Sequence, residues 1–447
     1  MKLGIIGGSG LENPSTERIM NSNSRGAQEP KSKVLDIIKD AKETTVNTPY
    51  GLPSSSIITG TISGIEVLIL SRHGKKHELS PSQVNYRANI AALQKLGCTH
   101  ILATTACGSL REEIKRGDFV ILDSFIDFTK HRKNTFHESF ENGVVHQSMS
   151  DPFSQFLREK LIESCSALNF PFHPKGTVIT IEGPRFSTRA ESKMYRILGA
   201  DVVNMSVATE AALANEAGIK YAVIAMSTDY DCWKTDEEPV NWDGILEIFN
   251  KNVEKVTKLI LETISQISND ERVQIEFIKS KIRTVPNWPK PGIMFRDITT
   301  LIKDREGFET LLNILEKRYK DKDIDVIAGV ESRGFIIGAA LASRLKKGFV
   351  LIRKPGKLPA DTIKEEYELE YGKDSVEIHK DAIKFGEKVL LVDDLIASGG
   401  TAAAAGKLIE RLGGTVVECA FIVELPELKG RDKISWPIYR VLDFEGE

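Results

Sequence analysis

The chain has 447 residues, with 60 Lys or Arg against 63 Asp or Glu and a formal net charge of −3. The charges balance on both sides of Ser268, so neither half has the basic surplus of a nucleic-acid-binding protein. No apolar run is long enough for a membrane span or a secretory signal, and we expect a cytoplasmic protein without membrane partners. Five cysteines at wide spacing include no Cys-x-x-Cys pair, which predicts reduced thiols.

Short apolar runs alternate with amphipathic stretches over the first part of the chain. Predicted strands cover 65–70, 100–105, 119–122, 175–181, 201–205 and 221–226, and predicted helices cover 83–96, 153–168, 188–198, 209–216 and 244–267. This alternation indicates an α/β sheet covered by helices on both faces. Residues 13–48 interrupt the pattern with polar residues, and we interpret them as a surface insertion with at most one amphipathic turn around 34–38.

The last helix of this series runs into a polar stretch, Gln266 to Arg272, without apolar periodicity. Such a composition is typical where few contacts cross between domains. We therefore expect a boundary between Ser268 and Asp270, with domains over 1–268 and 269–447. The second domain has its own α/β series, with helices near 272–282, 305–319, 334–345 and 401–412 and strands at 325–330, 349–352, 388–392 and 415–423.

Residues 388–401 contain the most specific motif of the chain. A buried strand ends in Asp393 and Asp394, and a turn of small residues leads into an Ala-rich helix. Backbone N–H groups at such a turn bind anions, and two carboxylates would take ribose hydroxyls and Mg²⁺ as partners. The turn consists of Ala397, Ser398, Gly399, Gly400 and Thr401. A Walker-type nucleotide site is excluded because its glycine-lysine spacing is absent, and a ribose 5-phosphate site is favoured over an ordinary turn.

This run resembles the phosphoribosyl diphosphate motif of type I phosphoribosyltransferases. With the segments 289–298, 327–334, 352–357 and 369–372, residues 270–443 are similar to the adenine phosphoribosyltransferases. The resemblance implies a parallel-sheet core and a mobile lid over about 355–374. It also implies adenine stacking on Phe295, with Arg296 and the backbone around Met294 reading the edge of the base.

The same resemblance assigns roles at the pyrophosphate. Its loop would be Glu331, Ser332 and Arg333, where Glu331 stands in place of an Asp that is frequent in the family. Pyrophosphate leaves in this reaction, so its charge must be neutralised, by Mg²⁺ and by Arg333, Arg353, Lys354 and Lys357. Glu370 would handle the proton of the base, and Tyr371 would help to close the lid.

In the first domain, Leu3 to Gly10 predicts a strand that enters a glycine turn with Ser9 at its apex. The dinucleotide fingerprint is absent because Asn13 occupies its third glycine position. The turn is therefore either an ordinary tight turn or a phosphate-binding one. The segments 71–74, 104–109, 181–186, 203–206 and 227–233 also stand at strand ends, where open α/β sheets build ligand sites.

Together these segments resemble the methylthioadenosine phosphorylases of the trimeric nucleoside phosphorylase family, over residues 1–267. The resemblance implies that inorganic phosphate is the co-substrate and that five residues bind it: Ser9, Arg72, His73, Thr105 and Ser206. Ala106 and Met205 would contact the ribose, and Phe186 would stack near the purine. His146 would approach the 5′ substituent, or else be structural, and Trp242 leaves open how large that substituent can be.

Asp229 and Asp231 would face the base. A carboxylate accepts from an exocyclic amine and, when protonated, donates to the N7 atom of the leaving purine. An oxopurine would instead call for an amide, so the two aspartates favour a 6-aminopurine over the alternative of a solvated acidic turn.

Adenine links the two resemblances. We expect a bifunctional salvage enzyme that releases adenine from methylthioadenosine and converts adenine to AMP with phosphoribosyl diphosphate. Two alternatives stay open: a fusion with one competent site of broader 6-aminopurine nucleoside specificity, and a nucleotide-sensing regulatory protein on the same folds. Trimeric and dimeric families on one chain predict a homo-oligomer, either a hexamer or a trimer.

Overall fold

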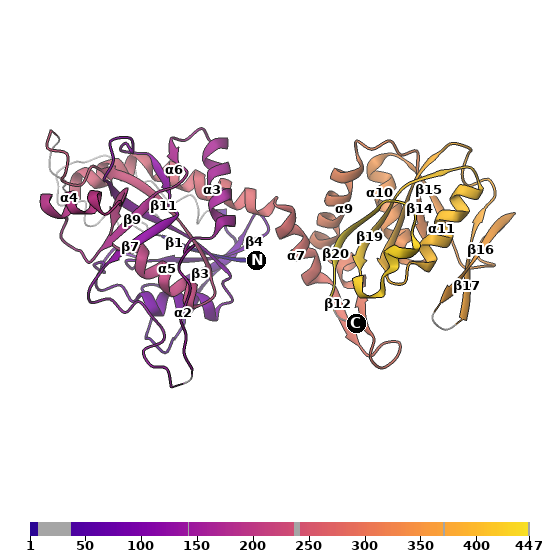
Figure 1. Ribbon diagram of the computed structural model, residues 1–447, viewed down its shortest axis with the longest axis horizontal. Helices are drawn as coiled ribbons and strands as arrows, with labels where there is room; N and C mark the ends of the chain where they lie inside the picture. Colours follow the sequence, from indigo (N-terminus) through magenta and orange to yellow (C-terminus); the bar gives the residue numbers. More distant parts are fainter. Residues whose placement is uncertain (8–36, 142, 237–241, 370–371, 446–447) are drawn as a thin grey trace. The chain divides into compact units, whose positions relative to one another are not determined.

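The computed structural model of the chain describes residues 1–7, 37–141, 143–236, 242–369 and 372–445. The chain divides into two compact units, Met1–Asp270 and Glu271–Glu447. Helix α6 (Trp242–Ser268) is the last element of the first unit, and α7 (Glu271–Lys281) is the first of the second (Figure 1). The short polar stretch between these helices is where we expected the boundary.

The first unit is built on a mixed sheet whose described strands number eleven. In chain order they are β1 (Lys2–Gly7), β2 (Lys39–Thr44), β3 (Ile57–Ile62), β4 (Ile65–Ser71), β5 (His100–Ser109), β6 (Phe119–Ile121), β7 (Ser124–Phe128), β8 (Phe172–His173), β9 (Thr177–Ile181), β10 (Val202–Asn204) and β11 (Lys220–Asp229). The spatial order is β2-β3-β4-β1-β5-β10-β9-β7, and β11 pairs with both β5 and β6. The central strands β4, β1, β5 and β11 are parallel, so their carboxyl ends meet at one edge.

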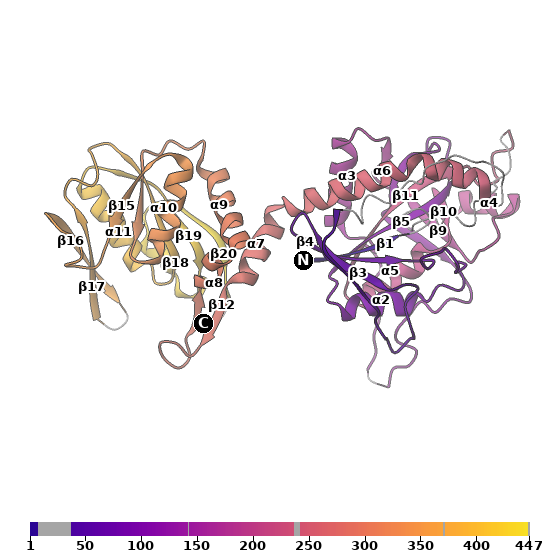
Figure 2. The same ribbon diagram turned by 180° about the vertical axis from the view of Figure 1, so that it is seen from behind.

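Helices cover this sheet on both sides, as predicted. Besides α6 they are α2 (Tyr86–Lys95), α3 (Gln155–Ala167), α4 (Arg189–Ile197) and α5 (Val207–Glu216). Helix α3 packs on α6, α2 packs on α5, and the two pairs lie on opposite sides of the central strands (Figures 1 and 2). Side chains define the helix starts: Asn85 accepts from the Ala88 N–H, and Thr188 forms a capping box with Glu191.

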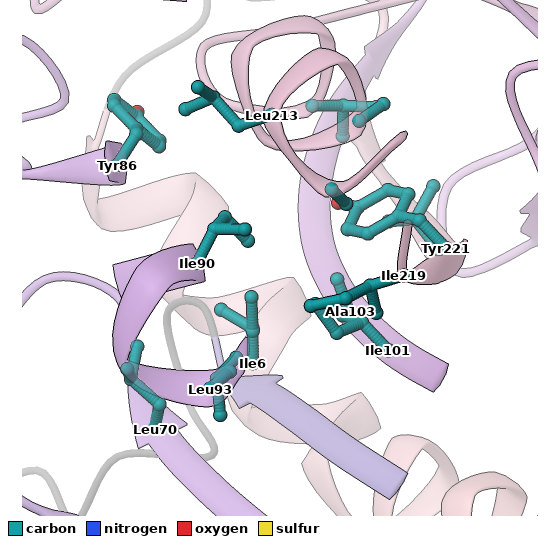
Figure 3. Packing of buried hydrophobic residues seen from close by; sticks show 14 of the residues in the cluster. Ile6, Leu70, Tyr86, Ile90, Leu93, Ile101, Ala103, Leu213, Ile219 and Tyr221 are labelled. Carbon is teal, nitrogen blue, oxygen red and sulfur yellow. The ribbon is translucent and has the colours of Figure 1, made fainter. Parts of the chain in front are cut away.

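One core of this unit lies between the central strands and the α2–α5 pair (Figure 3), and buried side chains of α3 and α6 pack on the other side of the sheet. Ile6 of β1 and Ile101 of β5 are fully buried and belong to one cluster with Ile90 and Leu93 of α2. The strands are nearly continuous in apolar residues because both faces are covered. This packing fixes the strand ends that carry the site described below.

The predicted polar insertion at 13–48 contains an element that its composition did not indicate. Residues 39–44 form β2, a largely exposed strand at the sheet margin that pairs antiparallel with β3. Polar side chains suit it because an edge strand has solvent on its outer side. The turn expected around 34–38 falls mostly outside the described residues.

The second unit has a five-stranded parallel sheet in the order β15-β14-β18-β19-β20. The strands are β14 (Val326–Val330), β15 (Gly348–Ile352), β18 (Lys388–Ile396), β19 (Thr415–Glu424) and β20 (Ile438–Asp443). Its helices are α7, α8 (Thr299–Lys303), α9 (Arg305–Tyr319), α10 (Arg333–Leu345) and α11 (Gly400–Arg411), with short 3-10 turns at Pro426–Leu428 and Gly430–Lys433. The predicted fold class, two α/β domains with a parallel sheet in the second, is confirmed.

Alternate residues of the central strands serve two separate cores. Leu390 and Val392 pack with α9 and α10, whereas Val389 and Leu391 pack with α11. Helix α10 begins close to β18 because Gly334 has no side chain. A Cβ on Gly334 would lie 3.0 Å from an Asp393 carboxylate oxygen. The start of α10 and the end of β18 are thereby brought together.

Two hairpins complete the second unit and were not expected from the sequence. One pairs β12 (Arg283–Pro286) with β13 (Met294–Asp297), and the other pairs β16 (Thr362–Leu369) with β17 (Gly372–His379). The second hairpin occupies much of the segment 355–374 that we expected to be a lid. Among the described residues, none of the helices combines the length and apolarity that a membrane span needs.

Candidate functional site

A cavity of about 440 Å³ opens in the first unit at the carboxyl ends of the sheet strands. Its lining includes nine of the residues predicted for substrate binding: Arg72, His73, Thr105, Ala106, Phe186, Met205, Ser206, Asp229 and Asp231. They come from loops and strand ends up to 159 positions apart in the chain. The volume lies within the range of small-molecule sites.

Two predicted residues do not join this cavity in the structure. Ser9 lies outside the described residues. His146 is exposed, and its ring packs edge-on against Phe140 with 5.5 Å between centroids. A role for either residue at the site stays a prediction.

The two aspartates form a buried carboxylate pair at the end of β11. Asp229 is 9% exposed and Asp231 is 7% exposed. One Asp229 oxygen accepts the backbone N–H of Asp231 at 2.7 Å, and the other lies 2.8 Å from the Thr228 hydroxyl. Burial, assisted by the charge of Asp231, raises the pKa of Asp229 to about 6, and burial also raises the pKa of Asp231.

The Thr228 hydroxyl can form a hydrogen bond with the Asp229 carboxyl whether that carboxyl is ionised or protonated. Its oxygen lies 2.8 Å from Asp229 Oδ2 and 3.2 Å from the Cys107 carbonyl oxygen. A hydroxyl has one proton, so it donates to Asp229 when that group is ionised. When Asp229 is protonated, Thr228 donates to Cys107 and accepts from the carboxyl instead. The pair is therefore able to hold or release a proton without leaving an unpaired donor.

Room for these carboxylates depends on Gly108. A Cβ at this position would lie 2.8 Å from Asp229 Oδ1 and 3.1 Å from Val203. Such a short distance to a carboxylate oxygen forces a shift of the side chain. The Gly-Ser pair in segment 104–109 marked this strand end, and the structure supplies the reason for its glycine.

Arg72 lines the cavity as an ion pair, because its charge is already matched by Glu210. Both side chains are 1% exposed, with Nε–Oε1 and Nη2–Oε2 distances of 2.5 and 2.9 Å. Nη1 donates to the Thr104 carbonyl at 2.9 Å, and Tyr221 donates to Glu210. Glu210 lies in α5 and belongs to none of the segments singled out in the sequence, since nothing local marks a partner 138 positions away.

His73 is neutral in this setting. Burial and the positive charge of Arg72 lower the pKa of His73 to about 3. Its Nδ1 lies 2.9 Å from the Leu79 carbonyl oxygen, and a carbonyl can only accept, so the proton is on Nδ1. Nε2 is then an acceptor, suited to a hydroxyl of phosphate or substrate more than to a bare phosphate oxygen.

Sequence reasoning missed further residues that line the cavity. His77 has a left-handed backbone, with φ of 52°, and its ring centroid lies 4.6 Å from that of His73. Asn204 donates to the Thr105 hydroxyl at 3.2 Å and accepts from Thr180 at 2.8 Å. Asn204 lies in the segment 203–206 that was predicted to stand at a strand end, and its polar side chain there was the available signal.

In the second unit, Asp393 and Asp394 lie near the end of the central strand β18, which continues to Ile396, four residues beyond the predicted end at Val392. Burial and the adjacent Asp394 carboxylate raise the pKa of Asp393. Asp394 is buried and forms an ion pair with Arg333 at the start of α10. Two predicted phosphoribosyl diphosphate residues, Arg333 and Asp394, therefore bind each other.

The small-residue turn after β18 is held by a second loop. Gly399 has φ of +74°, a conformation that glycine adopts without strain. A Cβ there would lie 2.2 Å from the Gly430 carbonyl oxygen, and a Cβ on Gly430 would lie 2.1 Å from that of Ala397. Ser398 and Thr401 are partly exposed, and Gly400 begins α11. The turn thus presents backbone and hydroxyls at a helix start, as an anion site requires.

Other predicted residues of this site also pair with one another. Arg353 Nε lies 3.0 Å from Glu331, which accepts the Lys354 backbone N–H at 3.1 Å as well. The Arg353 hydrogen bond is the main cause of a lowered pKa for Glu331. Lys354 forms an ion pair with Asp374, and the Lys357 carbonyl accepts from Arg353 at 3.1 Å. Ser332 precedes α10, whereas Glu370 and Tyr371 lie outside the described residues.

Phe295, the predicted adenine platform, lies in β13 between two other side chains. The Trp288 ring centroid is 4.3 Å away in an edge arrangement, and the Arg333 guanidinium lies 5.5 Å from the Phe295 centroid. Arg296 points to the other face of the hairpin, where it donates to Thr284 at 2.6 Å and stacks on Phe444. Its side chain and that of Phe295 therefore do not share one face, and the adjacent Met294 offers backbone groups.

The donor set at the end of β18 fits Mg²⁺ only in part. Mg²⁺ takes oxygen ligands, and Asp393 and Asp394 supply adjacent carboxylates. Within the described part of the chain, no group of three or more His, Cys, Asp or Glu side chains is placed to hold a metal ion. An ion at this position would therefore need further oxygens from a bound phosphate compound.

Both units together define a class of enzyme. A cavity lined by both anion-type donors and a titratable carboxylate suits cleavage of a nucleoside, and a small-residue turn after paired acidic residues suits transfer of a phosphoribosyl group. The chain is a pentosyltransferase.

Comparisons with known proteins specify the family. Residues 29–265 match the model of the phosphorylase superfamily, and residues 302–445 match that of the phosphoribosyl transferase domain. The chain belongs to the phosphorylase superfamily and carries a phosphoribosyltransferase domain after it.

Individual relatives match the first unit over most of their length. S-methyl-5′-thioadenosine phosphorylase of Xenopus tropicalis is 46% identical over 295 residues, which are 65% of this chain and 98% of the relative. The Danio rerio protein of the same name is 47% identical over 60% of this chain and 89% of its own. The structure of methylthioadenosine phosphorylase from Schistosoma mansoni with adenine is 40% identical, has a TM-score of 0.54, and covers 63% of this chain and 96% of its own.

Proposed function

We propose that the first unit cleaves 5′-methylthioadenosine with inorganic phosphate, giving adenine and 5-methylthioribose 1-phosphate. The observation that carries this proposal is Asp229: a buried carboxyl with a pKa of about 6 in the cavity that also holds Arg72 and His73. A proton donor with that pKa can work near neutral pH. The similarity to methylthioadenosine phosphorylases supports the choice of substrate.

The chemistry follows from the two ends of the cavity. A phosphate oxygen forms the bond to C1′ of the ribose as the bond from C1′ to the purine breaks, and the electron pair goes to the base. Asp229 gives its proton to N7, so adenine leaves neutral, and Asp231 accepts from the exocyclic amine. Arg72, Thr105 and Ser206 donate to phosphate, while neutral His73 accepts from its hydroxyl; Ser9 would complete this set.

The ribose and the base would lie between these ends. Met205 and the Ala106 backbone would contact the sugar, and Phe186, which is 38% exposed at the cavity, would cover the purine. Loss of water around Asp229 is what raises its pKa, so the buried setting both holds the proton and directs it to the substrate.

The second unit, in this proposal, converts adenine and phosphoribosyl diphosphate to AMP and pyrophosphate. The Ala397–Thr401 turn binds the 5-phosphate, and Phe295 stacks on the base. Asp393 and Asp394 hold the ribose hydroxyls and Mg²⁺, which when bound neutralises charge on the leaving pyrophosphate. Arg333, Arg353, Lys354 and Lys357 donate to the same leaving group. Glu370, which would handle the proton of the base, and Tyr371 complete the proposed set.

This assignment does not require the ion pairs to break when substrate binds. Arg333 contacts Asp394 through Nε, and Arg353 contacts Glu331 through Nε and Nη2. A guanidinium has five N–H donors, so each arginine keeps donors for pyrophosphate while its ion pair stays in place.

A single assay tests the whole proposal. The protein is incubated with methylthioadenosine, phosphate, Mg²⁺ and phosphoribosyl diphosphate, and AMP is measured by chromatography. Omission of phosphate should abolish both products, whereas omission of phosphoribosyl diphosphate should leave adenine. Adenine without AMP in the complete mixture would contradict the second half, and release of no adenine would contradict the first.

We also propose a homo-oligomer. Three-fold contacts of the first unit and two-fold contacts of the second close into a hexamer when the axes cross at right angles, and a trimer results if the two-fold contacts are unused. Light scattering measures the mass against 49.6 kDa for one chain. A monomer mass would contradict both assemblies.

A further inference from the structure

Behind the cavity wall of the first unit lies an arginine that the reaction proposed above does not use. Arg132 does not line the cavity, its side chain is 3% exposed, and it follows β7 by a few residues. Burying a guanidinium without hydrogen-bond partners for its N–H groups costs folding free energy, so a buried arginine is normally bound to several partners. Its partners therefore show what it holds in place.

Those partners are the chain segments that leave the two adjacent strands β9 and β10. Nη1 donates to the Met205 carbonyl at 2.6 Å, and Nη2 donates to the Glu182 carbonyl at 2.6 Å. Nε donates to the Glu182 carboxylate at 3.2 Å, and Nη1 also donates to the Tyr86 hydroxyl at 2.7 Å. One planar group thus fixes three segments with at least four hydrogen bonds.

Met205 is held from a second direction. Gly183 has φ of +67°, and a Cβ there would lie 2.5 Å from the Met205 sulfur, so the side chain fits only against a glycine. The Tyr86 hydroxyl adds a longer hydrogen bond to the Met205 carbonyl, at 3.4 Å. Met205 lines the cavity next to Ser206, so a shift of its carbonyl moves the cavity floor.

Glu182 fixes the other end of the same arrangement. Its carboxylate accepts the backbone N–H groups of Lys130 and His131 at 2.7 and 3.2 Å, besides the Arg132 side chain. The segment that carries Arg132 is therefore itself anchored to the end of β9. This closed set of contacts leaves the guanidinium little freedom to move away from Met205.

We propose that Arg132 is a positioning residue for the nucleoside: it holds the Met205 carbonyl and the Glu182–Gly183 turn so that the cavity floor matches the substrate. This inference rests on the proposed phosphorolysis. Lysine keeps the charge but has no planar fork, so it cannot reach the Met205 and Glu182 carbonyls together.

The experiment compares Arg132→Lys with Arg158→Lys. Arg158 is a matched control, since it also donates to two backbone carbonyls, those of Leu122 and Pro174, both at 2.9 Å. Neither of these two partners lines the cavity, whereas Met205 does. Arg132→Lys should raise KM for methylthioadenosine about tenfold or more, the scale of a lost charge-assisted hydrogen bond, with a smaller change in kcat and none in KM for phosphate. Arg158→Lys should leave all three unchanged.

The outcomes separate the two proposals. Wild-type protein that does not cleave methylthioadenosine contradicts the proposed function. The affinity for methylthioadenosine by calorimetry, expected to fall about tenfold in Arg132→Lys only, then tests the positioning role alone. An active wild type with unchanged KM in Arg132→Lys overturns the positioning role. If Arg132→Lys does not fold, Glu182→Gln weakens the contact between Arg132 Nε and the Glu182 carboxylate that orients the guanidinium. A raised KM for methylthioadenosine is again expected, and an unchanged KM overturns the inference.

Discussion

Nη2 of Arg72 and Oε2 of Glu210 lie 2.9 Å apart in a fully buried ion pair, with the Tyr221 hydroxyl donating to the same carboxylate oxygen. The end of the cavity that is proposed to bind phosphate therefore has an arginine whose orientation is fixed before any ligand binds. A fixed donor loses little side-chain entropy when an anion binds, which would favour the proposed phosphate binding.

Glu210→Gln should strongly destabilise the first unit, because it leaves the Arg72 charge buried without its partner. The expected loss is about 3–5 kcal/mol in the free energy of unfolding, measured by denaturant titration. Glu66→Gln is the control: Glu66 pairs with Lys2 at 2.7 Å at the surface, where a pair contributes roughly 0–1 kcal/mol. Equal stability of the two variants would contradict the role given to the buried pair.

Asp229→Asn should slow adenine release from methylthioadenosine by roughly 10²–10⁴-fold, because an amide cannot give its proton to N7. Formation of AMP from added adenine should not change, since that reaction uses the second unit. Asp40→Asn, at an exposed position of β2, serves as the control for the loss of one carboxylate. Wild-type rates in Asp229→Asn would remove Asp229 from the mechanism.

The same residue predicts how phosphorolysis depends on pH. Burial raises the pKa of Asp229 to about 6, so the carboxyl is protonated below that pH and becomes unable to donate above it. Accordingly, kcat/KM for methylthioadenosine should be constant at low pH and fall about tenfold per unit above pH 6, once other ionisations are corrected for. The measurement is a pH profile of initial rates, and a rise of kcat/KM through this range would show that the ionised form is the active one.

The strands of both sheets and most of the cavity residues could be predicted from the sequence, because short polar motifs follow the strands. Asp229, Ser206 and Thr105 were each predicted from such a motif, and each lines the cavity. Glu210 and Arg132 were not predicted, because their importance comes from partners distant in the chain rather than from neighbours. A single sequence does not indicate which helix residue will form an ion pair with a buried arginine.

In the second unit the limits are of another kind. The turn at 397–401 was recognisable because glycine and small residues follow two aspartates. The supporting loop at Gly430 was not, since its role is a close approach of backbone to backbone. The hairpins β12–β13 and β16–β17 were also missed. The strands of the first hairpin have only four residues each, and those of the second are rich in charged residues, with a short apolar alternation at Val376 and Ile378.

Gly399→Ala and Gly386→Ala separate backbone strain from the contact with the supporting loop. Both glycines have left-handed backbones, with φ of +74° and +82°, so an alanine is strained at either position. At Gly386 no atom lies within 4 Å of the added Cβ, whereas at Gly399 the Gly430 carbonyl oxygen would be 2.2 Å away. Only Gly399→Ala must therefore displace the turn that is proposed to bind the 5-phosphate.

AMP formation should fall about 100-fold in Gly399→Ala, the scale expected for a binding group moved by about 1 Å, and stay near the wild-type rate in Gly386→Ala. Adenine release from methylthioadenosine should be unchanged in both variants, which shows that the first unit is intact. An equal, small loss of AMP formation in the two variants would mean that strain alone matters and that the turn at Gly399 does not bind the phosphate.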